Sequence, residues 1–264
     1  MTAARSDRPV ALITLATGYV GPALARRMAA SGFDLVLHVP GSGSGTMVAG
    51  EPGGEDLRSQ IVAEHATTEI EIVDGDLTTA EGNRVVVDAA LERFGRLDAA
   101  CFVTGVIITG RFLENTTEQW DRVKRTNLDM VFHALQAVLP PMLKAGSGQI
   151  VVFTSAAGAR PEPKVSIYSA TRAGANALVR AVGLEHAASG ITVNAIGTNF
   201  MDFPGFLAAT GATDPERRAK IEAQVPARRL GTMAELAEFT AVLLDGRSRF
   251  QTGQFFSFSG GWST

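Results

Sequence analysis

Three residues whose side chains can move a proton stand close together in the second half of the chain. Ser155 follows an apolar run, Tyr168 comes thirteen residues later, and Arg172 follows Tyr168 by four. Side chains four residues apart on a helix project from the same face. A guanidinium beside a phenol favours the charged phenolate. The spacing therefore predicts a site in which Tyr168 takes a proton from a substrate hydroxyl that Ser155 orients.

The surrounding sequence predicts the elements that must position these side chains. Residues 150–153 read as a buried strand, Thr154 and Ser155 open a Gly/Pro loop, and a helical pattern of small and apolar residues runs from about Val165. Ser155 would then lie at the carboxyl end of a parallel strand, where open α/β sheets bind their ligands.

Short apolar runs and helical patterns alternate along the rest of the chain. Strands are predicted over 10–14, 33–39, 69–73, 97–103, 191–196 and 254–258, and helices over 22–31, 56–64, 81–94, 117–143, 166–188 and 233–244. Pro140 and Pro141 mark the expected end of the helix over 117–143. The alternation predicts an α/β, Rossmann-like doubly wound parallel sheet of seven strands with helices on both faces, in a single domain over 1–264.

Composition excludes several other classes of protein. The 264 residues are 45% apolar and 19% charged with a net charge of −3, which predicts a large core and neither nucleic acid nor a membrane surface as partner. The single cysteine, Cys101, lies in an apolar run and is expected to be a packing thiol in a reducing cytoplasm. The four histidines lack ligand spacing, so no metal is expected; they are His38, His65, His133 and His186.

The stretch around Tyr168 resembles the short-chain dehydrogenase/reductase superfamily, whose signature is Ser followed by Tyr-x-x-x-Lys. Here Arg172 stands at the lysine position. The superfamily's glycine-rich turn after the first strand is altered too. Leu15 replaces its first glycine in either possible register, and Tyr19 replaces the second glycine in one of them. Both changes put bulk where the backbone must approach a pyrophosphate.

Three further cofactor motifs of the superfamily are absent. No acid follows the second strand, where His38 precedes a glycine-rich loop over 40–54. Residues 102–105 replace Asn-Asn-Ala-Gly, and Thr198-Asn199 replaces the Pro-Gly on which nicotinamide docks. We therefore expect no cofactor.

Ser-x12-Tyr-x3-Arg without the glycine motif resembles the halohydrin dehalogenases, a cofactor-independent branch of the superfamily. The resemblance implies a carbon–halide lyase that converts vicinal haloalcohols to epoxides and opens epoxides with azide, cyanide or nitrite. It assigns catalysis to Ser155, Tyr168 and Arg172. It places a halide or other small anion in the vacated cofactor space, against the residues Tyr19, Thr198, Asn199, Phe200 and Met201.

Other positions keep two interpretations. Phe203 and Trp262 are candidates for the substrate pocket, although Phe203 and Phe206 equally fit a hydrophobic lid, and Trp262 equally fits ordinary packing. Asn127 matches the superfamily's proton-relay asparagine, but without a ribose a structural role is favoured.

Two rival functions stay open. The first is an NAD(P)-dependent short-chain oxidoreductase with a degenerate glycine motif, since Gly18 and Gly21 remain. The second is a binding protein that has lost its chemistry. A homotetramer is expected from the two helices that pair between subunits in this superfamily.

Overall fold

The computed structural model describes residues 7–40, 53–103 and 105–263. Within them, seven strands form one sheet in the order β3-β2-β1-β4-β5-β6-β7, and all neighbouring strands are parallel. The strands are β1 (Val10–Ile13), β2 (Asp34–His38), β3 (Ile70–Val73), β4 (Ala99–Phe102), β5 (Gly148–Ser155), β6 (Ile191–Thr198) and β7 (Phe255–Phe258). The predicted Rossmann-like sheet is confirmed.

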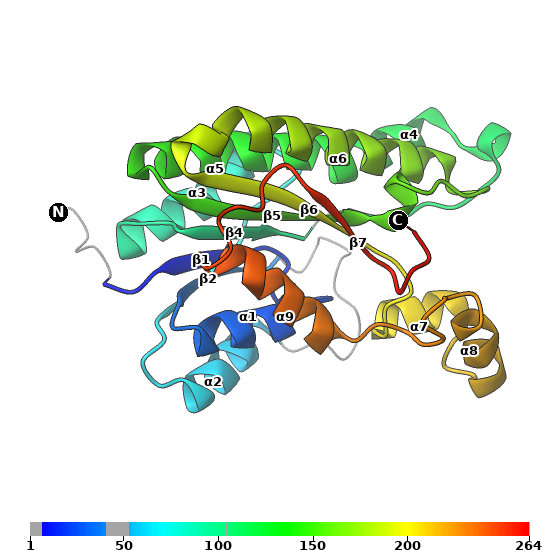
Figure 1. Cartoon of the computed structure of the whole chain (residues 1–264), viewed down its shortest axis with the longest axis horizontal. Helices are drawn as coiled ribbons and strands as arrows, with labels where there is room; N and C mark the ends of the chain where they lie inside the picture. Colours follow the sequence, from blue (N-terminus) through cyan, green and yellow to red (C-terminus); the bar gives the residue numbers. More distant parts are fainter. Residues whose placement is uncertain (1–6, 41–52, 104, 264) are drawn as a thin grey trace.

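Helices cover both faces of this sheet. They are α1 (Gly21–Ala30), α2 (Gly54–Glu64), α3 (Ala80–Phe94), α4 (Thr117–Lys124), α5 (Met130–Ala145), α6 (Ser166–His186), α7 (Pro204–Thr210), α8 (Pro215–Glu222) and α9 (Met233–Leu244). Figure 1 shows α1, α2 and α9 on one face and α3, α5 and α6 on the other. Because both faces are covered, the central strands β1, β4 and β5 are buried along their whole length.

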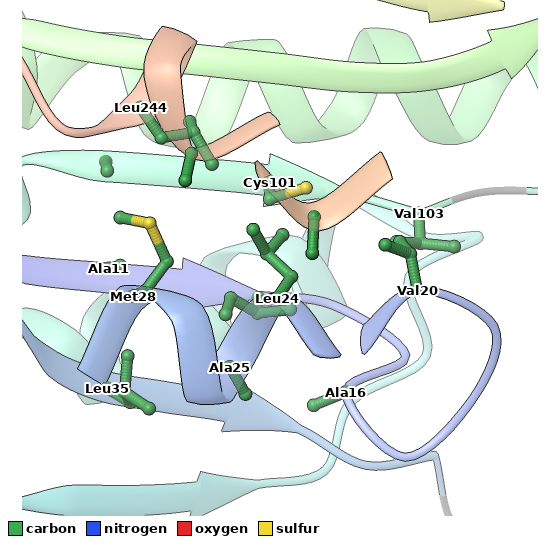
Figure 2. Close-up of a cluster of buried hydrophobic side chains, with 14 of the residues drawn as sticks. Ala11, Ala16, Val20, Leu24, Ala25, Met28, Leu35, Cys101, Val103 and Leu244 are labelled. Carbon is green, nitrogen blue, oxygen red and sulfur yellow. The ribbon is translucent and has the colours of Figure 1, made fainter. Parts of the chain in front are cut away.

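Two hydrophobic clusters fill the spaces between sheet and helices. One joins β1, β2 and β4 to α1 and α9, and Cys101 lies inside it between Leu24 and Leu244 (Figure 2). Burial raises the pKa of the Cys101 thiol. The side chain is therefore a neutral packing group, as the sequence predicts.

The helix predicted over 117–143 is interrupted. A π-helical turn, Arg125–Asp129, separates α4 from α5, and Asn127 lies within it. The Asn127 side-chain amide donates to the carbonyl oxygen of Val123 at 2.9 Å and to that of Val106, also at 2.9 Å. Such a turn inserts one extra residue into the helix and can aim a side chain out of the ladder. Sequence periodicity cannot register this insertion.

Two further expectations about helices are wrong. Pro140 and Pro141 lie inside α5, which continues to Ala145 and ends at Gly146, a residue in the left-handed conformation. The two prolines remove amide donors near the end of the helix, and the glycine cap ends it instead. The stretch after β6, expected to be a loop, holds α7 and α8, each of which begins at a proline. The predicted glycine-rich loop over 40–54 lies mostly outside the described residues.

Candidate active site

Ser155 ends β5, directly opposite Thr198 at the end of β6. Its hydroxyl oxygen accepts a hydrogen bond from the amide of Ala157 at 3.1 Å and lies 3.5 Å from the carbonyl oxygen of Thr198. The side chain is almost fully buried. The hydroxyl is thus held at the carboxyl edge of the sheet, where the sequence predicted it.

Tyr168 and Arg172 lie side by side on α6. The central carbon of the Arg172 guanidinium is 5.2 Å from the centroid of the Tyr168 ring. Arg172 is 4% exposed, and its Nη1 donates to the carbonyl oxygen of Phe153 at 3.3 Å. The buried guanidinium thus packs against the ring of Tyr168 as a cation–π pair.

Glycine at position 105 makes room for this guanidinium. Gly105 has a φ of 95°, and a β-carbon there would lie 2.5 Å from Nη2 of Arg172 and 1.9 Å from Oδ1 of Asn127. A side chain at this position would therefore displace both polar groups. The hydrogen bonds that Asn127 donates to backbone carbonyls support the structural role expected for it.

Tyr19 crosses the site from the turn after β1. Its hydroxyl donates to the Thr198 hydroxyl at 2.8 Å. Its ring meets Phe153 edge-on with centroids 6.0 Å apart, and Phe203 with centroids 4.8 Å apart. Tyr19 thereby connects the first strand's turn to the end of the sixth.

Tyr19 lies close enough to Tyr168 and Arg172 for their charges to act on its phenol. Burial raises the pKa of the Tyr19 phenol, the hydrogen bond with Thr198 opposes this shift, and the charges of Tyr168 and Arg172 also act on it. Tyr19 is therefore a neutral phenol at physiological pH. The site brings Tyr19, Tyr168, Arg172 and Thr198 together.

The turn after β6 is bonded largely within the protein. The amide of Asn199 donates to Phe258 at 3.4 Å, and that of Phe200 donates to the Asn199 side chain at 2.9 Å. Phe200 has a φ of 55°, which is the left-handed region, and Met201 pairs with Gly231. Two of the amides expected to hold an anion thus already have protein acceptors.

Aromatic rings continue from this turn to the last described residues. Phe200 packs against Trp262 with centroids 5.7 Å apart and against Phe206 at 6.2 Å. Phe206 lies 6.4 Å from Phe203, which contacts Tyr19. Trp262 is 6% exposed. The candidate pocket residues Phe203 and Trp262 therefore belong to one aromatic row.

A dinucleotide would have to cross the space that Tyr19 fills. In open α/β sheets it lies over the carboxyl ends of the strands where the strand order reverses, here between β1 and β4. β4 and β5 separate β1 from β6, so the hydrogen bond between Tyr19 and Thr198 spans this crevice. Leu15, with a φ of 48°, stands in the turn where the first glycine is lost. The Tyr19 side chain therefore spans the region in which a dinucleotide would lie.

His38, at the end of β2, lies between the turn after β1 and the turn after β3. Its Nδ1 accepts from the Leu15 amide at 3.3 Å, and its Nε2 lies 2.9 Å from the Gly75 carbonyl oxygen. Burial lowers the pKa of His38, while the bond with Gly75 and the charge of Asp74 oppose the shift. A neutral imidazole thus links the turns after β1 and β3. The sequence predicted neither bond, because it showed His38 only as a histidine without ligand spacing at a position that lacks the expected acid.

The described residues contain no group of three His, Cys, Asp or Glu residues that could hold a metal ion. No helix among them is long and apolar enough to cross a membrane.

Fold and site together define a short-chain dehydrogenase/reductase. A family model described as enoyl-(acyl carrier protein) reductase matches residues 18–263, and the chain belongs to that family. The 3-oxoacyl-[acyl-carrier-protein] reductase FabG of Staphylococcus epidermidis is 29% identical over 255 residues, covering 95% of this chain and 97% of the relative. FabG of Staphylococcus aureus is 28% identical over 253 residues, covering 95% and 96%.

Solved structures agree on the fold. The crystal structure of levodione reductase matches with a TM-score of 0.86 and 27% identity over 98% of both chains. YwfH, an NADPH-dependent reductase involved in bacilysin biosynthesis, matches with the same TM-score at 19% identity, over 97% of this chain and 98% of that one. The second likeness concerns the fold alone.

These findings contradict the expected halohydrin dehalogenase. The family model and the relatives named above are reductases, and none is a carbon–halide lyase. Haloalcohols, epoxides and halide are accordingly withdrawn as substrates and ligands. The rival prediction of an NAD(P)-dependent short-chain oxidoreductase agrees better with the relatives, although it must be reconciled with Leu15, Tyr19 and His38. The resemblance failed because most of its motifs are shared across the superfamily.

Proposed function

We propose that this chain is an enzyme of the short-chain dehydrogenase/reductase family in which Tyr168 transfers a proton to or from an oxygen atom of a small organic substrate. Ser155 hydrogen-bonds the same oxygen, and Arg172 stabilises the charged form of the phenol. The observation that carries this proposal is the packing of the Arg172 guanidinium against the Tyr168 ring, 5.2 Å from its centroid, at the carboxyl edge of the sheet.

Two reaction types share this proton transfer. The relatives favour reduction of a carbonyl group, for which a bound nicotinamide would supply the hydride and Tyr168 would supply the proton. The hydrogen bond from Tyr19 to Thr198 favours a reaction that moves the proton without nicotinamide, because it spans the crevice at 2.8 Å. The two reaction types differ in whether a dinucleotide must bind to the protein.

The experiment measures oxidation of NADH and NADPH by the native protein with a panel of small ketones and aldehydes. Tyr168→Phe is run in parallel and should lower any turnover about 10²–10⁴-fold, the usual contribution of a general acid or base. Circular dichroism confirms that the variant folds. Turnover that survives this substitution would contradict the role of Tyr168.

Dependence on nucleotide decides between the two types. Carbonyl-dependent oxidation of NADPH that needs Tyr168 would establish a reductase. If no nucleotide is consumed, the same two proteins are compared in a nucleotide-free screen of hydroxyl- and carbonyl-containing compounds by mass spectrometry. A product formed by the native protein and lost in Tyr168→Phe would then establish the second type.

We also propose a homotetramer. The α6 helix exposes small side chains at regular spacing, at the positions Ala170, Ala173, Ala177 and Ala181. Phe132 on the neighbouring α5 is exposed as well. Small residues permit close approach of helices, and closed two-fold symmetry is common in soluble oligomers. Light scattering at micromolar concentration tests this proposal, which a monomer would contradict.

A further inference from the structure

Arg160 joins two segments that lie far apart in the sequence. It follows the short helical turn Ala156–Gly158 that comes directly after Ser155, and its amide donates to Ala156 at 2.9 Å. The centre of its guanidinium lies 4.6 Å from the centroid of the Trp262 ring. Its Nη1 also donates to the carbonyl oxygen of Trp262. One side chain thus holds both the ring and the backbone of Trp262.

Residues 259–262, here called the tail segment, follow β7 and reverse direction at a glycine pair. Gly260 and Gly261 have φ values of 60° and 87°, in the region that glycine adopts without strain. At the base of the segment, the Ser263 amide donates to the Ser259 hydroxyl at 3.0 Å. These bonds fix where the reversal occurs, while Arg160 contacts the segment at Trp262.

A cavity of about 300 Å³ lies beside the tail segment. Its lining includes Phe200, Val225, Ser259 and Gly260. The segment is also held by the Ala227 amide, which donates to the carbonyl oxygen of Gly260 at 3.0 Å. The cavity leaves Gly260 without close packing on one side, and Arg160 adds a second contact to the segment at Trp262.

The position of Trp262 affects the crevice through adjacent rings. Trp262 packs against Phe200, two residues beyond Thr198, whose hydroxyl binds Tyr19. Movement of the tail segment would release Phe200, which is held in the left-handed conformation. The wall of the crevice would change with it.

We propose that Arg160 is a positioning residue: it fastens the tail segment as one wall of the crevice and so sets the size of substrate that reaches Tyr168. The statement about size rests on the proposed function, whereas the fastening does not. The two parts are tested by separate measurements.

Fluorescence tests the fastening without any substrate. Trp120 and Trp262 are the two tryptophans of the chain, so Trp120→Phe leaves Trp262 as the reporter. In that background, Arg160→Met should raise acrylamide quenching about threefold, because the indole loses the guanidinium that covers it. Arg160→Lys keeps a cation, so its acrylamide quenching should lie between that of the Trp120→Phe protein and that of the Arg160→Met variant. Arg84→Met, an exposed arginine on α3, is the matched control and should change nothing. Equal quenching in the Trp120→Phe protein with and without Arg160→Met would overturn the proposal.

Steady-state kinetics test whether the tail segment limits the size of the substrate. With a homologous substrate series, Arg160→Met should raise KM for the smallest member about tenfold while kcat changes little, and longer members should lose less or gain. The preference for small substrates then falls about tenfold. Raised quenching with unchanged preference would overturn the size-selecting role and leave the fastening. If Tyr168→Phe keeps full turnover, the proposed function fails, and the fluorescence result still decides the role of Arg160.

Discussion

The carboxyl edge of the sheet has two halves that differ in what their side chains do. At β5, β6 and α6, Ser155 ends its strand opposite Thr198, and the Arg172 guanidinium packs against the Tyr168 ring. At β1 and β2, Leu15 and His38 bond to one another and to the turn after β3. The first half keeps its hydroxyl, its phenol and a cation. The second half is closed by protein groups.

This difference indicates that the two tasks of the fold are physically separable. Proton transfer needs side chains on two adjacent strands and one helix, whereas a dinucleotide needs open backbone at the β1 turn. Tyr19 is the residue that links the halves, since it starts at the β1 turn and ends on Thr198.

Removing the cation from the proton-transfer half should have the largest effect. Arg172→Met leaves a phenol without a charged neighbour, and activity should fall by about 10² or more. Arg172→Lys keeps the charge but loses the planar fork that reaches Phe153, so its loss should be nearer tenfold. Steady-state kinetics with matched thermal melts separate these effects from unfolding. Equal losses in both variants would show that charge is not what Arg172 provides.

Nucleotide binding tests the closed half. If Leu15 and Tyr19 block the crevice, NADPH at millimolar concentration should leave the melting temperature unchanged. A ligand at a hundredfold excess over its Kd would stabilise the fold by about 2.7 kcal/mol, which is roughly 5–10 °C for a chain of this size.

Leu15→Gly with Tyr19→Gly is the matched variant for that test. Both positions already have positive φ, which glycine adopts without strain. Reopening the turn should make a nucleotide-dependent shift appear. A shift of several degrees in the native protein would mean that Tyr19 moves aside, and the contrast between the halves would then belong to the ligand-free state alone.

His38 gives the closed half a pH-dependent stability. Its pKa is lowered by burial from the usual 6.5, so the unfolded chain binds this proton more readily than the folded one. Its contribution is therefore complete above pH 6.5 and declines as pH falls below it. At pH 8, His38→Gln should cost about 1–3 kcal/mol of unfolding free energy. Urea unfolding should show this difference shrinking in acid, and a constant difference would mean that His38 does not titrate.

The smallest expected effect lies outside both halves. Lys164 precedes α6 with an exposed side chain and a φ of 69°. Lys164→Gly should stabilise the fold by about 0.5–1 kcal/mol because the left-handed conformation strains a residue with a β-carbon. Activity should stay the same. A loss of activity would mean that strain in this loop helps to position Tyr168.

The fold could be predicted from the sequence because its signals are local. The alternation of apolar runs and helical patterns identified all seven strands, and Met233–Leu244 was predicted to the residue. The π-helical turn was missed, since one inserted residue leaves the hydrophobic pattern almost unchanged. The helices α7 and α8 were missed because each is only seven or eight residues long and begins at a proline that reads as a loop signal.

The candidate site was predictable in part. Spacing on one strand and one helix predicted that Ser155 ends β5 and that Tyr168 and Arg172 share a face of α6, and the structure places them so, whereas their catalytic role stays a prediction. The tie from Tyr19 to Thr198 joins residues 179 positions apart, and the contact of Arg160 with Trp262 joins residues 102 apart. No periodicity encodes such pairs. The reaction was assigned wrongly because Ser-x12-Tyr-x3-Arg without the glycine motif was weighed above the motifs that the whole superfamily shares.

The π-helical turn Arg125–Asp129 has a consequence for changes in chain length. Each residue of an α-helix turns the chain by about 100°. Loss of one residue here would allow a continuous regular helix, so a measurement of helix content alone would score the deletion as harmless. The same deletion would rotate α4 relative to α5 and withdraw the Asn127 amide from Val106. The number of residues in this turn is therefore constrained separately from their identity. Substitutions on its exposed face should be neutral, whereas deletion of one residue should not be.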